Sequence, residues 1–438
     1  MMRPDSLAGW LAYLETLHPK AIALGLDRVR EVYQRMGTRI RCPVVTVGGT
    51  NGKGSTCAFI ATMLKSAGYR VGAYSSPHLL RYNERVQIDG LIASDEQIIA
   101  SFNAVESARV GIEGGTPIAL TYFEFGTLAA LHQFAHARLD ALVLEVGLGG
   151  RLDAVNIVDP DVAVVTSVDF DHVELLGPTR ESIGREKAGI FRAGRPAICG
   201  DADPPQSLID HAGAIGAQLL LIGRDYRYVS QGRQWRYEGP HGARHGLPLP
   251  ALNGAYQLGN AATALCALDL LRGKLPVSAG AIRAGLTQVE LHGRFEVVPG
   301  RPTIVLDVAH NPQAARALTS TLGDMGFHPT TTAVFGMLAD KDIAAVVQAL
   351  KPRIDRWSIA PLPGPRGATS ERLRTELENA GVNPRAITDF PSIAAALAAA
   401  RKQAGETDRI VVFGSFLTVA AALQALRSAP SATHASLA

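Results

Sequence analysis

The sequence predicts an α/β protein of two domains, each built on a mostly parallel sheet. Short apolar segments alternate with stretches of helical periodicity along most of the 438 residues, which is typical of parallel strands joined by helices. At roughly 150 residues per domain, this length corresponds to two or three domains. A second series of alternating segments begins near residue 300, after a polar interruption. We therefore predict a first domain over residues 1–297, a smaller second domain over 298–427 and a disordered tail over 428–438.

Composition excludes several classes of protein. Hydrophobic residues make up 47% of the chain, and 43 Lys and Arg against 40 Asp and Glu give a net charge of +3. So small an excess gives no electrostatic reason to expect a nucleic acid or an anionic membrane as partner. The four cysteines are far apart, as in a reducing compartment, and no apolar run approaches the roughly 18 residues of a membrane span. We expect a cytoplasmic, monomeric protein that acts on small molecules.

The apolar runs predict the elements of the first domain. In order, they predict a strand, a helix and three strands over residues 42–47, 53–67, 70–75, 140–146 and 161–168. The strands are apolar on both faces, as strands covered by helices must be, and Gly68 ends the helix. Residues 224–244 alternate Tyr, Trp and Arg, which indicates a solvated surface hairpin rather than a nucleobase platform. A buried helix is predicted over residues 260–271.

The second domain is predicted to be a smaller, Rossmann-like α/β unit. Alanine-rich helices separate five predicted strands, over residues 303–308, 331–336, 357–360, 385–388 and 409–413. Asp307 ends the first of these strands, and a short turn leads to Asn311 and Pro312. Asparagine is a preferred N-cap and proline a preferred first helical residue, so a helix should begin there.

A glycine-rich loop joins the first strand to the first helix of this series. In residues 48–56, GGTNGKGST, the glycines let backbone N–H groups approach phosphate oxygens, and the helix N-terminus favours negative charge. Lys53 would reach the outer phosphates, and Ser55 or Thr56 would hold Mg²⁺. The strict phosphate-loop pattern fails at Val47, which replaces its first glycine, and at Gly54, which separates Lys53 from Ser55. The sequence predicts a nucleotide-binding domain of the P-loop type, but not a GTPase or a motor.

The departure from the strict phosphate-loop pattern is itself similar to a known group of enzymes. TNGKGS with its extra glycine is similar to the ATP-dependent amide ligases that include folylpolyglutamate synthase and the Mur peptide ligases. Further segments resemble the folate branch, the bifunctional dihydrofolate synthases/folylpolyglutamate synthases: SSPHL at 75–79, RYNER at 81–85, TYFE at 121–124, EVGLGGRLD at 145–153, DH at 171–172, EKAGI at 186–190, DVAHNP at 307–312 and GSF at 414–416. The matches run in the family's order from about residue 20 to 420.

The resemblance implies ATP and two Mg²⁺ ions as cofactors, with specific residues for each. The implied ATP contacts are Asn51, Gly52, Lys53, Gly54, Ser55, Asn260, Arg294 and Asp307. The implied metal ligands are Ser55, Ser76, Glu145, His172 and Lys187. Lys53, Lys187 and His310 are implied to be catalytic, and His310 and Ser415 to bind glutamate. Without the resemblance, the strand-end position of Glu145 beside the phosphate loop favours a Mg²⁺ ligand over a surface salt bridge, whereas a lone histidine such as His172 is usually structural.

Lys187 carries an argument of its own. A helix over 180–191 would place Ile183, Ile190 and Phe191 on the same face as this lysine, so its ammonium should be buried and its pKa should fall toward neutrality. A neutral amine can take up CO₂ as a carbamate, which is an anion able to hold a second Mg²⁺. The alternative is a snorkelling lysine paired with Glu186 or Asp171. The resemblance implies the carbamate.

The resemblance also implies a site for the acceptor. Its residues are Gly25, Leu26, Asp27, Arg28, Thr121, Tyr122, Phe123, Glu124, Leu152, Asp153 and Ala154. Phe123 could stack on a pterin ring, and Asp27 or Asp153 could accept its amino hydrogens. From the residues alone, Tyr122 and Phe123 are rather core residues where a helix begins. Arg81 and Arg85 suit either anion recognition or a charged surface.

These observations predict an ATP-dependent ligase that adds L-glutamate to dihydropteroate and to folates through an acyl phosphate. A monofunctional folylpolyglutamate synthase and a Mur-type peptide ligase are alternatives. The phosphate loop begins by residue 48, which argues against the nucleotide-sugar domain expected of a Mur-type enzyme. A protein of another class, a nucleotide-binding switch that hydrolyses ATP slowly, is a further alternative.

Overall fold

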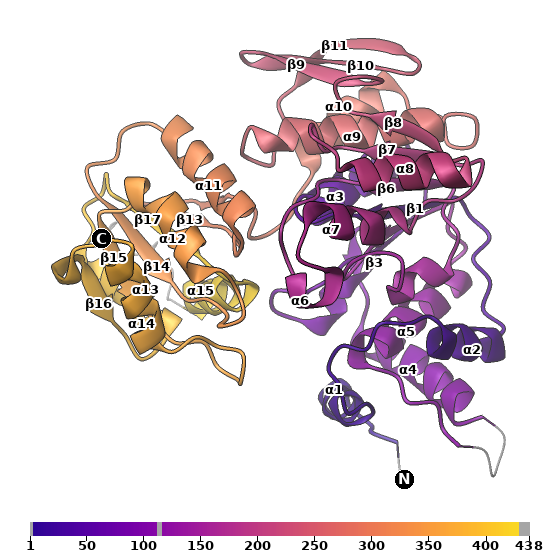
Figure 1. Cartoon of the computed structure of the whole chain (residues 1–438), viewed down its shortest axis with the longest axis horizontal. Helices are drawn as coiled ribbons and strands as arrows, with labels where there is room; N and C mark the ends of the chain where they lie inside the picture. Colours follow the sequence, from indigo (N-terminus) through magenta and orange to yellow (C-terminus); the bar gives the residue numbers. More distant parts are fainter. Residues whose placement is uncertain (1–2, 112–115, 429–438) are drawn as a thin grey trace, which may run out of the picture. The chain divides into compact units, whose positions relative to one another are not determined.

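The computed structural model describes residues 3–111 and 116–428 (Figure 1). The chain divides into two compact units, the first formed by Met1–Ala251 with Gln257–Glu290 and the second by Leu252–Tyr256 with the chain from Leu291 onward. The predicted tail over 428–438 lies outside the described residues, except that Ser428 is the last residue of a helix.

An eight-stranded sheet organises the described part of the first unit, in the order β4-β3-β2-β5-β1-β6-β7-β8. Its strands are β1 (Val44–Gly48), β2 (Val71–Tyr74), β3 (Val86–Ile88), β4 (Leu91–Ile92), β5 (Ala141–Glu145), β6 (Val162–Val165), β7 (Pro196–Cys199) and β8 (Gln218–Leu221). The neighbours β2, β5, β1, β6, β7 and β8 pair in parallel in that order. Strands β3 and β4 pair antiparallel and extend the sheet beyond β2. The central strands β1, β5 and β6 are buried throughout, as their apolar sequences predict.

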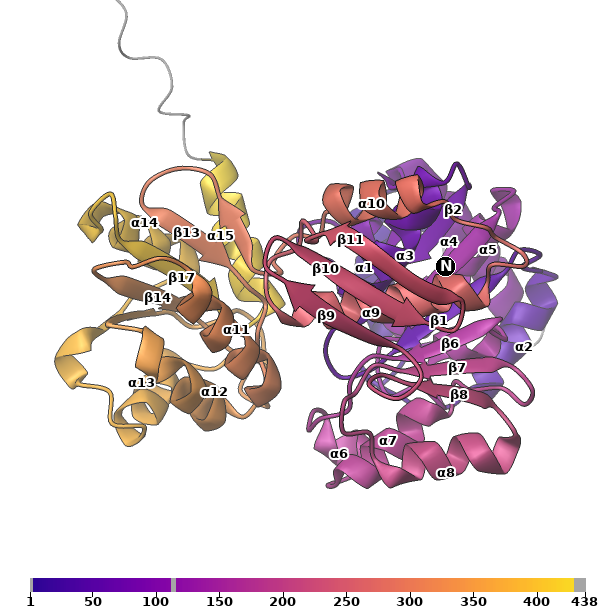
Figure 2. The same cartoon turned by 90° about the horizontal axis from the view of Figure 1, so that it is seen from above.

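Helices surround this sheet. They are α1 (Leu7–Thr16), α2 (Asp27–Met36), α3 (Lys53–Ser66), α4 (Asp95–Val110), α5 (Tyr122–His136), α6 (Val173–Leu176), α7 (Arg180–Ala188), α8 (Gln206–Ile215), α9 (Tyr256–Leu270) and α10 (Ala279–Gln288), with 3₁₀ turns η1 (Tyr82–Arg85) and η2 (Ala154–Ile157). Figure 1 shows α1, α2, α4 and α5 gathered in the lower part of the unit, and Figure 2 shows α7 and α8 beside β7 and β8. Among the described residues, none of these helices or those of the second unit has the length and apolar character that crossing a membrane requires.

The segment predicted as a hairpin at 224–244 is a small sheet of three antiparallel strands. It comprises β9 (Arg227–Gln231), β10 (Gln234–Gly239) and β11 (Gly242–Pro248), and lies over α9 and α10 (Figure 2). The prediction of surface strands is confirmed, but a third strand continues beyond the predicted end. The sheet is anchored to α9 by Asp269, which accepts hydrogen bonds from the Tyr237 hydroxyl at 3.0 Å and from both terminal nitrogens of Arg244 at 3.1 and 2.5 Å.

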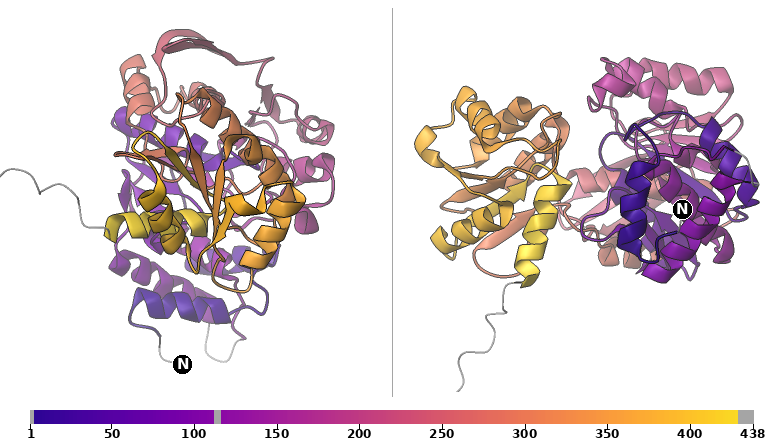
Figure 3. Two further views of the ribbon diagram at one scale, coloured as in Figure 1. Left: turned by 90° about the vertical axis from the view of Figure 1, so that its left-hand side faces the viewer. Right: turned by 90° about the horizontal axis from the view of Figure 1, so that it is seen from below.

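The second unit contains a six-stranded sheet in its described part, in the order β12-β13-β17-β14-β15-β16. Its elements are β12 (Glu296–Val298), β13 (Thr303–Leu306), α11 (Pro312–Asp324), β14 (Thr331–Phe335), α12 (Ile343–Leu350), η3 (Lys351–Arg353), β15 (Arg356–Ile359), α13 (Ser370–Asn379), η4 (Pro384–Ala386), β16 (Ile387–Asp389), α14 (Ile393–Gln403), β17 (Arg409–Phe413) and α15 (Phe416–Ser428). All pairs are parallel except β12 with β13. Figure 3 shows these strands, in orange, between helices on both faces.

Two predicted elements have different bounds for identifiable reasons. The helix predicted over 180–191 is three residues too long, since α7 ends at Ala188. It ends there because the Gly189 N–H bonds to the Glu186 and Lys187 carbonyls instead of continuing the helical pattern. The strand predicted over 385–388 begins only at Ile387, because η4 precedes it and Pro384 has no N–H for a strand ladder. The helix predicted to begin at Asn311 begins there as expected, with its side chain capping the Ala314 N–H at 2.9 Å.

We predict that Asp269→Ala lowers the free energy of unfolding of the first unit by about 3 kcal/mol, because Asp269 is 2% exposed and its loss leaves the buried Tyr237 hydroxyl and the Arg244 guanidinium without their acceptor. Urea denaturation followed by far-ultraviolet circular dichroism measures the change. The matched control is Glu31→Ala, whose exposed pair with Arg35 should cost less than about 0.5 kcal/mol. Equal losses for the two variants would contradict the anchoring role of Asp269.

Candidate functional site

The glycine-rich loop between β1 and α3 makes two close approaches that only glycine permits. Gly49 has φ 144°, and a Cβ there would lie 1.9 Å from the Thr166 hydroxyl. Gly52 has φ 88°, and a Cβ there would lie 2.5 Å from the Asn260 side-chain oxygen. The loop therefore lies against the end of β6 on one side and against α9 on the other. The structure brings the predicted residue Asn260 to the loop, 208 positions after Gly52 in the sequence.

Lys53 begins α3 and lies inside the curve of the loop. Its ammonium donates to the carbonyl oxygens of Gly49 at 3.0 Å and Thr50 at 3.1 Å. Ser55 and Thr56, in the first turn of α3, are 2% and 0% exposed, and the Thr56 hydroxyl is buried without a hydrogen-bond partner. A loop of backbone amides, a helix N-terminus and an ammonium group at one place favour an anion such as phosphate.

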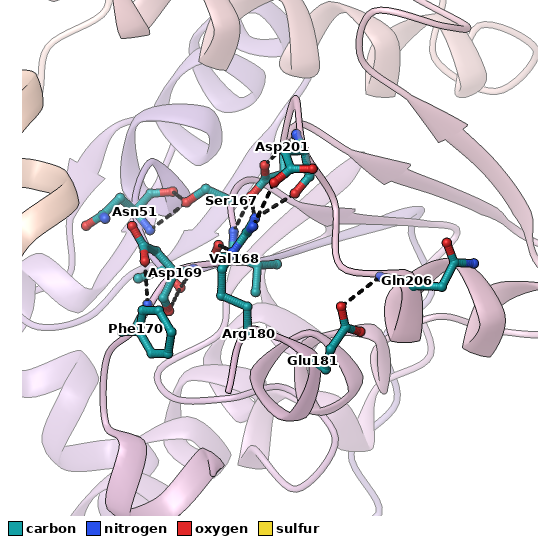
Figure 4. A network of polar contacts seen from close by, with 11 residues as sticks. Asn51, Ser167, Val168, Asp169, Phe170, Arg180, Glu181, Asp201 and Gln206 are labelled. Atoms are coloured by element: carbon teal, nitrogen blue, oxygen red, sulfur yellow. Dashed lines mark hydrogen bonds and ion pairs between the residues drawn. The ribbon is translucent and has the colours of Figure 1, made fainter. Parts of the chain in front are cut away.

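The segment that follows β6 holds the loop in place (Figure 4). The Thr50 N–H donates to the Ser167 carbonyl at 2.8 Å, and the Asn51 N–H donates to the Ser167 hydroxyl at 3.0 Å. The Thr166 hydroxyl donates to the Asn51 carbonyl at 2.6 Å. These hydroxyl residues were not predicted as part of the site. Their signal in the sequence was a Thr-Ser pair at the carboxyl end of a strand that neighbours β1.

Glu145 lies beside the phosphate loop because β5 pairs in parallel with β1 and places Glu145 opposite Val47. It is 5% exposed, and its Oε2 accepts a hydrogen bond from the Ser76 N–H at 3.3 Å. The structure thus brings together the predicted metal ligands Glu145 and Ser76. Carboxylate and hydroxyl oxygens are the donors that Mg²⁺ prefers, so this pair fits that ion.

His172 has a backbone in the left-handed region, with φ 51° and ψ 41°, at the start of α6. Its ring nitrogens lie 3.8 Å from Asp171 and 3.7 Å from Glu174. In the described ranges, no group of three or more His, Cys, Asp or Glu side chains is arranged to hold a metal. The predicted ligand set therefore depends on serine hydroxyls and on Lys187 as well.

Lys187 is 3% exposed, and its pKa is lowered to about 7 by burial and by the nearby Lys53 ammonium, against the opposing effect of Asp171 and Asp153. The predicted burial and lowered pKa are confirmed. The alternative of a pair with Glu186 is wrong, because the Glu186 carboxylate binds Arg151 at 2.7 Å. A lysine with this pKa is about half neutral amine near pH 7.

The residues predicted to bind the acceptor form two groups, one at the starts of α2 and α5 and the other at the start of η2. In the first, the Glu124 carboxylate is 4% exposed and binds Arg28 at 2.7 Å and the Thr121 N–H at 2.7 Å. Asp27 is fully exposed at the start of α2. Glu124 and Arg28 therefore bind each other and fix the start of α5 relative to α2.

The second group is centred on Asp153. Its carboxylate accepts the N–H groups of Leu148 and Val155, both at 2.9 Å, and burial raises its pKa to about 6. Phe123 links the two groups, because a Cβ on Gly147 would lie 2.6 Å from its ring. Phe123 and Tyr122 are half-buried, which places them between a core residue and a binding surface.

The two arginines of the RYNER segment differ. Arg81 is exposed and pairs with Asp95 at 3.2 Å, so a surface charge is the correct interpretation for it. Arg85 is 8% exposed, so a surface charge is the wrong one. Its guanidinium carbon lies 5.5 Å from the centre of the Tyr122 ring, and its Nε donates to His78 Nδ1 at 3.0 Å. Burial and the arginine charge lower the pKa of His78 to about 4, so His78 is a neutral acceptor.

A second cluster lies in the second unit. Asp307 is 6% exposed, with its two carboxylate oxygens 2.8 Å from the N–H groups of Phe295 and Ala309. Burial raises its pKa, against the opposing effect of Arg294 and His310. The Arg294 guanidinium lies 5.0 Å from the centre of the Phe416 ring.

The neighbouring residue predicted to bind glutamate, Ser415, is 4% exposed and accepts the Leu417 N–H at 3.2 Å. The structure thus groups Arg294, Asp307 and His310 and puts Ser415 next to Phe416. The role of each remains a prediction.

Comparisons with known proteins identify both halves of the chain. Residues 47–268 match the Mur ligase middle domain, and residues 293–416 match the Mur ligase glutamate ligase domain. A dihydrofolate synthase/folylpolyglutamate synthase of Escherichia coli is 48% identical over 421 residues, which cover 96% of this chain and 95% of that protein. One from Haemophilus influenzae is 42% identical over 433 residues, which cover 94% and 96%.

Solved structures agree with these matches. Escherichia coli FolC in complex with DHPP and ADP has a TM-score of 0.90 at 48% identity, covering 97% of this chain and 98% of that one. A bifunctional folylpolyglutamate synthase/dihydrofolate synthase with Mn, AMPPNP and L-glutamate bound has a TM-score of 0.88 at 46% identity, with the same coverage.

We predict that the stability contributed by Lys187 depends on pH. Between about pH 7 and pH 10 the unfolded chain keeps this proton while the folded chain has released it, so the free energy of unfolding should rise with pH by up to about 1.4 kcal/mol per pH unit. Denaturation of the metal-free protein, compared with Lys187→Met over this range, isolates the effect. Lys65→Met, which removes an exposed lysine of α3, is the control and should differ from wild type by a constant amount. A constant difference for Lys187→Met as well would contradict the lowered pKa.

Proposed function

Because the chain belongs to the Mur ligase family, in the branch of the bifunctional dihydrofolate synthases/folylpolyglutamate synthases, we propose that it joins L-glutamate to dihydropteroate and to folates with the hydrolysis of ATP. The observation that carries the proposal is the set of groups around one loop. The Lys53 ammonium donates to a carbonyl of the loop, and the bonded pair of Glu145 and Ser76 lies beside it. Lys187 is close enough to Lys53 for that charge to lower its pKa.

The reaction needs an activated carboxylate, because a carboxylate is a poor electrophile. An oxygen of the acceptor carboxylate attacks the γ-phosphorus of ATP, the bond to the bridging oxygen breaks, and ADP leaves as an acyl phosphate forms. The glutamate amine then attacks the acyl carbon, loses a proton, and expels inorganic phosphate as the amide forms. Lys53, placed at the loop carbonyls, supplies positive charge where the transferred phosphoryl group develops negative charge.

Glu145, Ser76 and Ser55 suit one Mg²⁺ ion, and Lys187 with His172 suits a second. Bound Mg²⁺ would neutralise charge on the phosphate oxygens during transfer. Lys187 can provide an oxygen ligand only as a carbamate. Its neutral Nζ attacks CO₂, an N–C bond forms, a proton leaves the nitrogen, and a carboxylate replaces the amine. A pKa of about 7 in a buried position favours that addition, since a protonated amine has no lone pair.

The second unit is proposed to supply the remaining contacts. Arg294 and Asp307 would bind ATP, and His310 and Ser415 would bind glutamate. Arg294, held over the Phe416 ring, offers a planar cation suited to phosphate. We also infer that the protein acts as a monomer in the cytoplasm. Its four cysteines are free, and three of them are buried, as expected in a reducing compartment.

ADP release with dihydropteroate, with folate, and with each in the presence and absence of glutamate tests the function. A bifunctional ligase should release ADP rapidly only when glutamate and either acceptor are both present, because phosphoryl transfer needs the acceptor and completion needs the amine. Mass spectrometry should show one added glutamate on dihydropteroate and one or more on folate. Turnover with folate alone as acceptor would favour a monofunctional enzyme. Turnover without either co-substrate would favour a nucleotide switch.

We predict that Lys187→Ala lowers ligase turnover by about 100-fold or more while ADP binding measured by calorimetry is retained, because the variant loses a proposed metal ligand but keeps the phosphate loop. Removing CO₂ from the wild-type protein should lower its activity, and bicarbonate should restore it. Lys65→Ala, on the exposed face of α3, is the matched control and should keep both properties. Near-normal turnover of Lys187→Ala would exclude the proposed role.

A further inference from the structure

Val168 lies in the segment after β6, and side chains from two other segments use both of its backbone polar groups. Its N–H donates to Asp201 Oδ2 at 2.7 Å, and its carbonyl accepts a hydrogen bond from Arg180 Nε at 3.1 Å (Figure 4). Asp201 follows β7, and Arg180 is the first residue of α7. A residue held on both sides by charged partners cannot shift without breaking charge-assisted hydrogen bonds.

Arg180 also binds the segment that carries Asp201. Its terminal nitrogens donate to the Asp203 carboxylate at 2.8 Å and to the Asp203 carbonyl at 2.6 Å, and one of them lies 3.6 Å from Asp201 Oδ2. The Asp201 side chain is 11% exposed, whereas that of Asp203 is 90% exposed. Asp201 is thus the partner that solvent screens least.

The residues on either side of Val168 bind the phosphate loop. Ser167 accepts the Thr50 N–H through its carbonyl and the Asn51 N–H through its hydroxyl. Asp169 donates its N–H to the Thr50 hydroxyl and accepts that hydroxyl's hydrogen through its carbonyl, both at 3.0 Å. A displacement of Val168 would therefore move the loop at both Thr50 and Asn51.

The same guanidinium is connected to Lys187. Helix α7 runs from Arg180 to Ala188, so Arg180 fixes the first turn of the short helix whose last turn carries Lys187. Arg180 is one of several contacts that position this helix, together with Glu181, which accepts the Ser207 N–H, and Glu186, which binds Arg151.

We propose that Arg180 and Asp201 are positioning residues for nucleotide binding: together they hold residues 167–169 in the conformation that shapes the phosphate loop. The hydrogen bonds and ion pairs of the two side chains go to Val168, to Asp203 and to each other. The proposal rests on the proposed function only in that the loop between β1 and α3 binds the nucleotide.

The test is the affinity of the full-length protein for ADP with Mg²⁺, measured by calorimetry, for wild type, Arg180→Ala, Asp201→Ala and Asp201→Asn. Each alanine variant should weaken ADP binding by about 10- to 100-fold, because small displacements of binding groups carry losses of that size. Asp201→Asn keeps an oxygen acceptor for the Val168 N–H and should lose less than Asp201→Ala. The double alanine variant should lose less than the product of the single losses, because both residues act on one segment.

Arg109→Ala is the control for an effect on ADP binding that comes from lost stability alone. Arg109 is buried, binds Glu106 at 2.7 Å and the Ile118 carbonyl at 3.3 Å, and lies on α4. This variant should lower the melting temperature but leave ADP affinity within about twofold. In turnover assays, Arg180→Ala should raise the KM for ATP more than the KM for glutamate.

The outcomes separate the two proposals. If wild type does not bind ADP, the proposed function fails. If wild type binds ADP and both alanine variants bind it as tightly, the positioning role is overturned. It is also overturned if Asp201→Asn and Asp201→Ala lose the same ADP affinity, or if Arg109→Ala weakens ADP binding as much as Arg180→Ala does. Should Arg180→Ala fail to fold by circular dichroism, the two Asp201 variants decide the question by the same criteria.

Discussion

The close contact of one glycine-rich loop with two neighbouring segments is the constraint on which the candidate site depends. At Gly49 and Gly52 a side chain would collide with Thr166 and Asn260, and both backbones have positive φ. The loop is therefore shaped by the residues that follow β6 together with two of its own side chains. Ser167 accepts the Thr50 and Asn51 N–H groups, Lys53 donates to the Gly49 and Thr50 carbonyls, and the Thr50 hydroxyl bonds to Asp169. That arrangement leaves the remaining backbone amides and the start of α3 available for an anion. It also explains why the strict phosphate-loop spacing is unnecessary, since the supporting contacts come from elsewhere in the unit.

Electrostatics then couples this loop to the residues around it. Burial and the nearby Lys53 ammonium lower the pKa of Lys187, while Asp171 and Asp153 oppose that change. The pKa of Lys187 is thereby lowered to about 7, and burial raises the pKa of Asp153 to about 6 against the opposing effect of its backbone hydrogen bonds and of Lys53. Titratable groups with pKa values displaced toward 7 from both directions mark this part of the first unit as a candidate catalytic centre.

The sequence predicted the elements whose patterns are local and left out what depends on distant contacts. The strand before the loop, the helix after it and the cap at Asn311 follow from apolar periodicity and capping rules, and Lys187 was placed on the buried face by its neighbours. The pairing of Asp201 with Val168 joins residues 33 positions apart through a backbone N–H, which has no sequence signature. The sequence left Arg85 open between anion recognition and a charged surface, because its burial depends on the contact with Tyr122, 37 positions away in the chain.

Each unit organises its polar groups before any substrate is bound. In the first unit, the Glu145 carboxylate accepts the Ser76 N–H, and in the second unit Asp307 is held by two backbone N–H groups beside Arg294. Buried carboxylates fixed by backbone donors do not need to reorganise in order to hold a cation, and preorganisation of this kind is the condition for electrostatic stabilisation. Because every one of these donors is a main-chain amide fixed by a strand end or turn, the geometry of the acids is a property of the fold itself. Substitutions that keep the side chains but move those strand ends should therefore disturb the chemistry as much as loss of the acids.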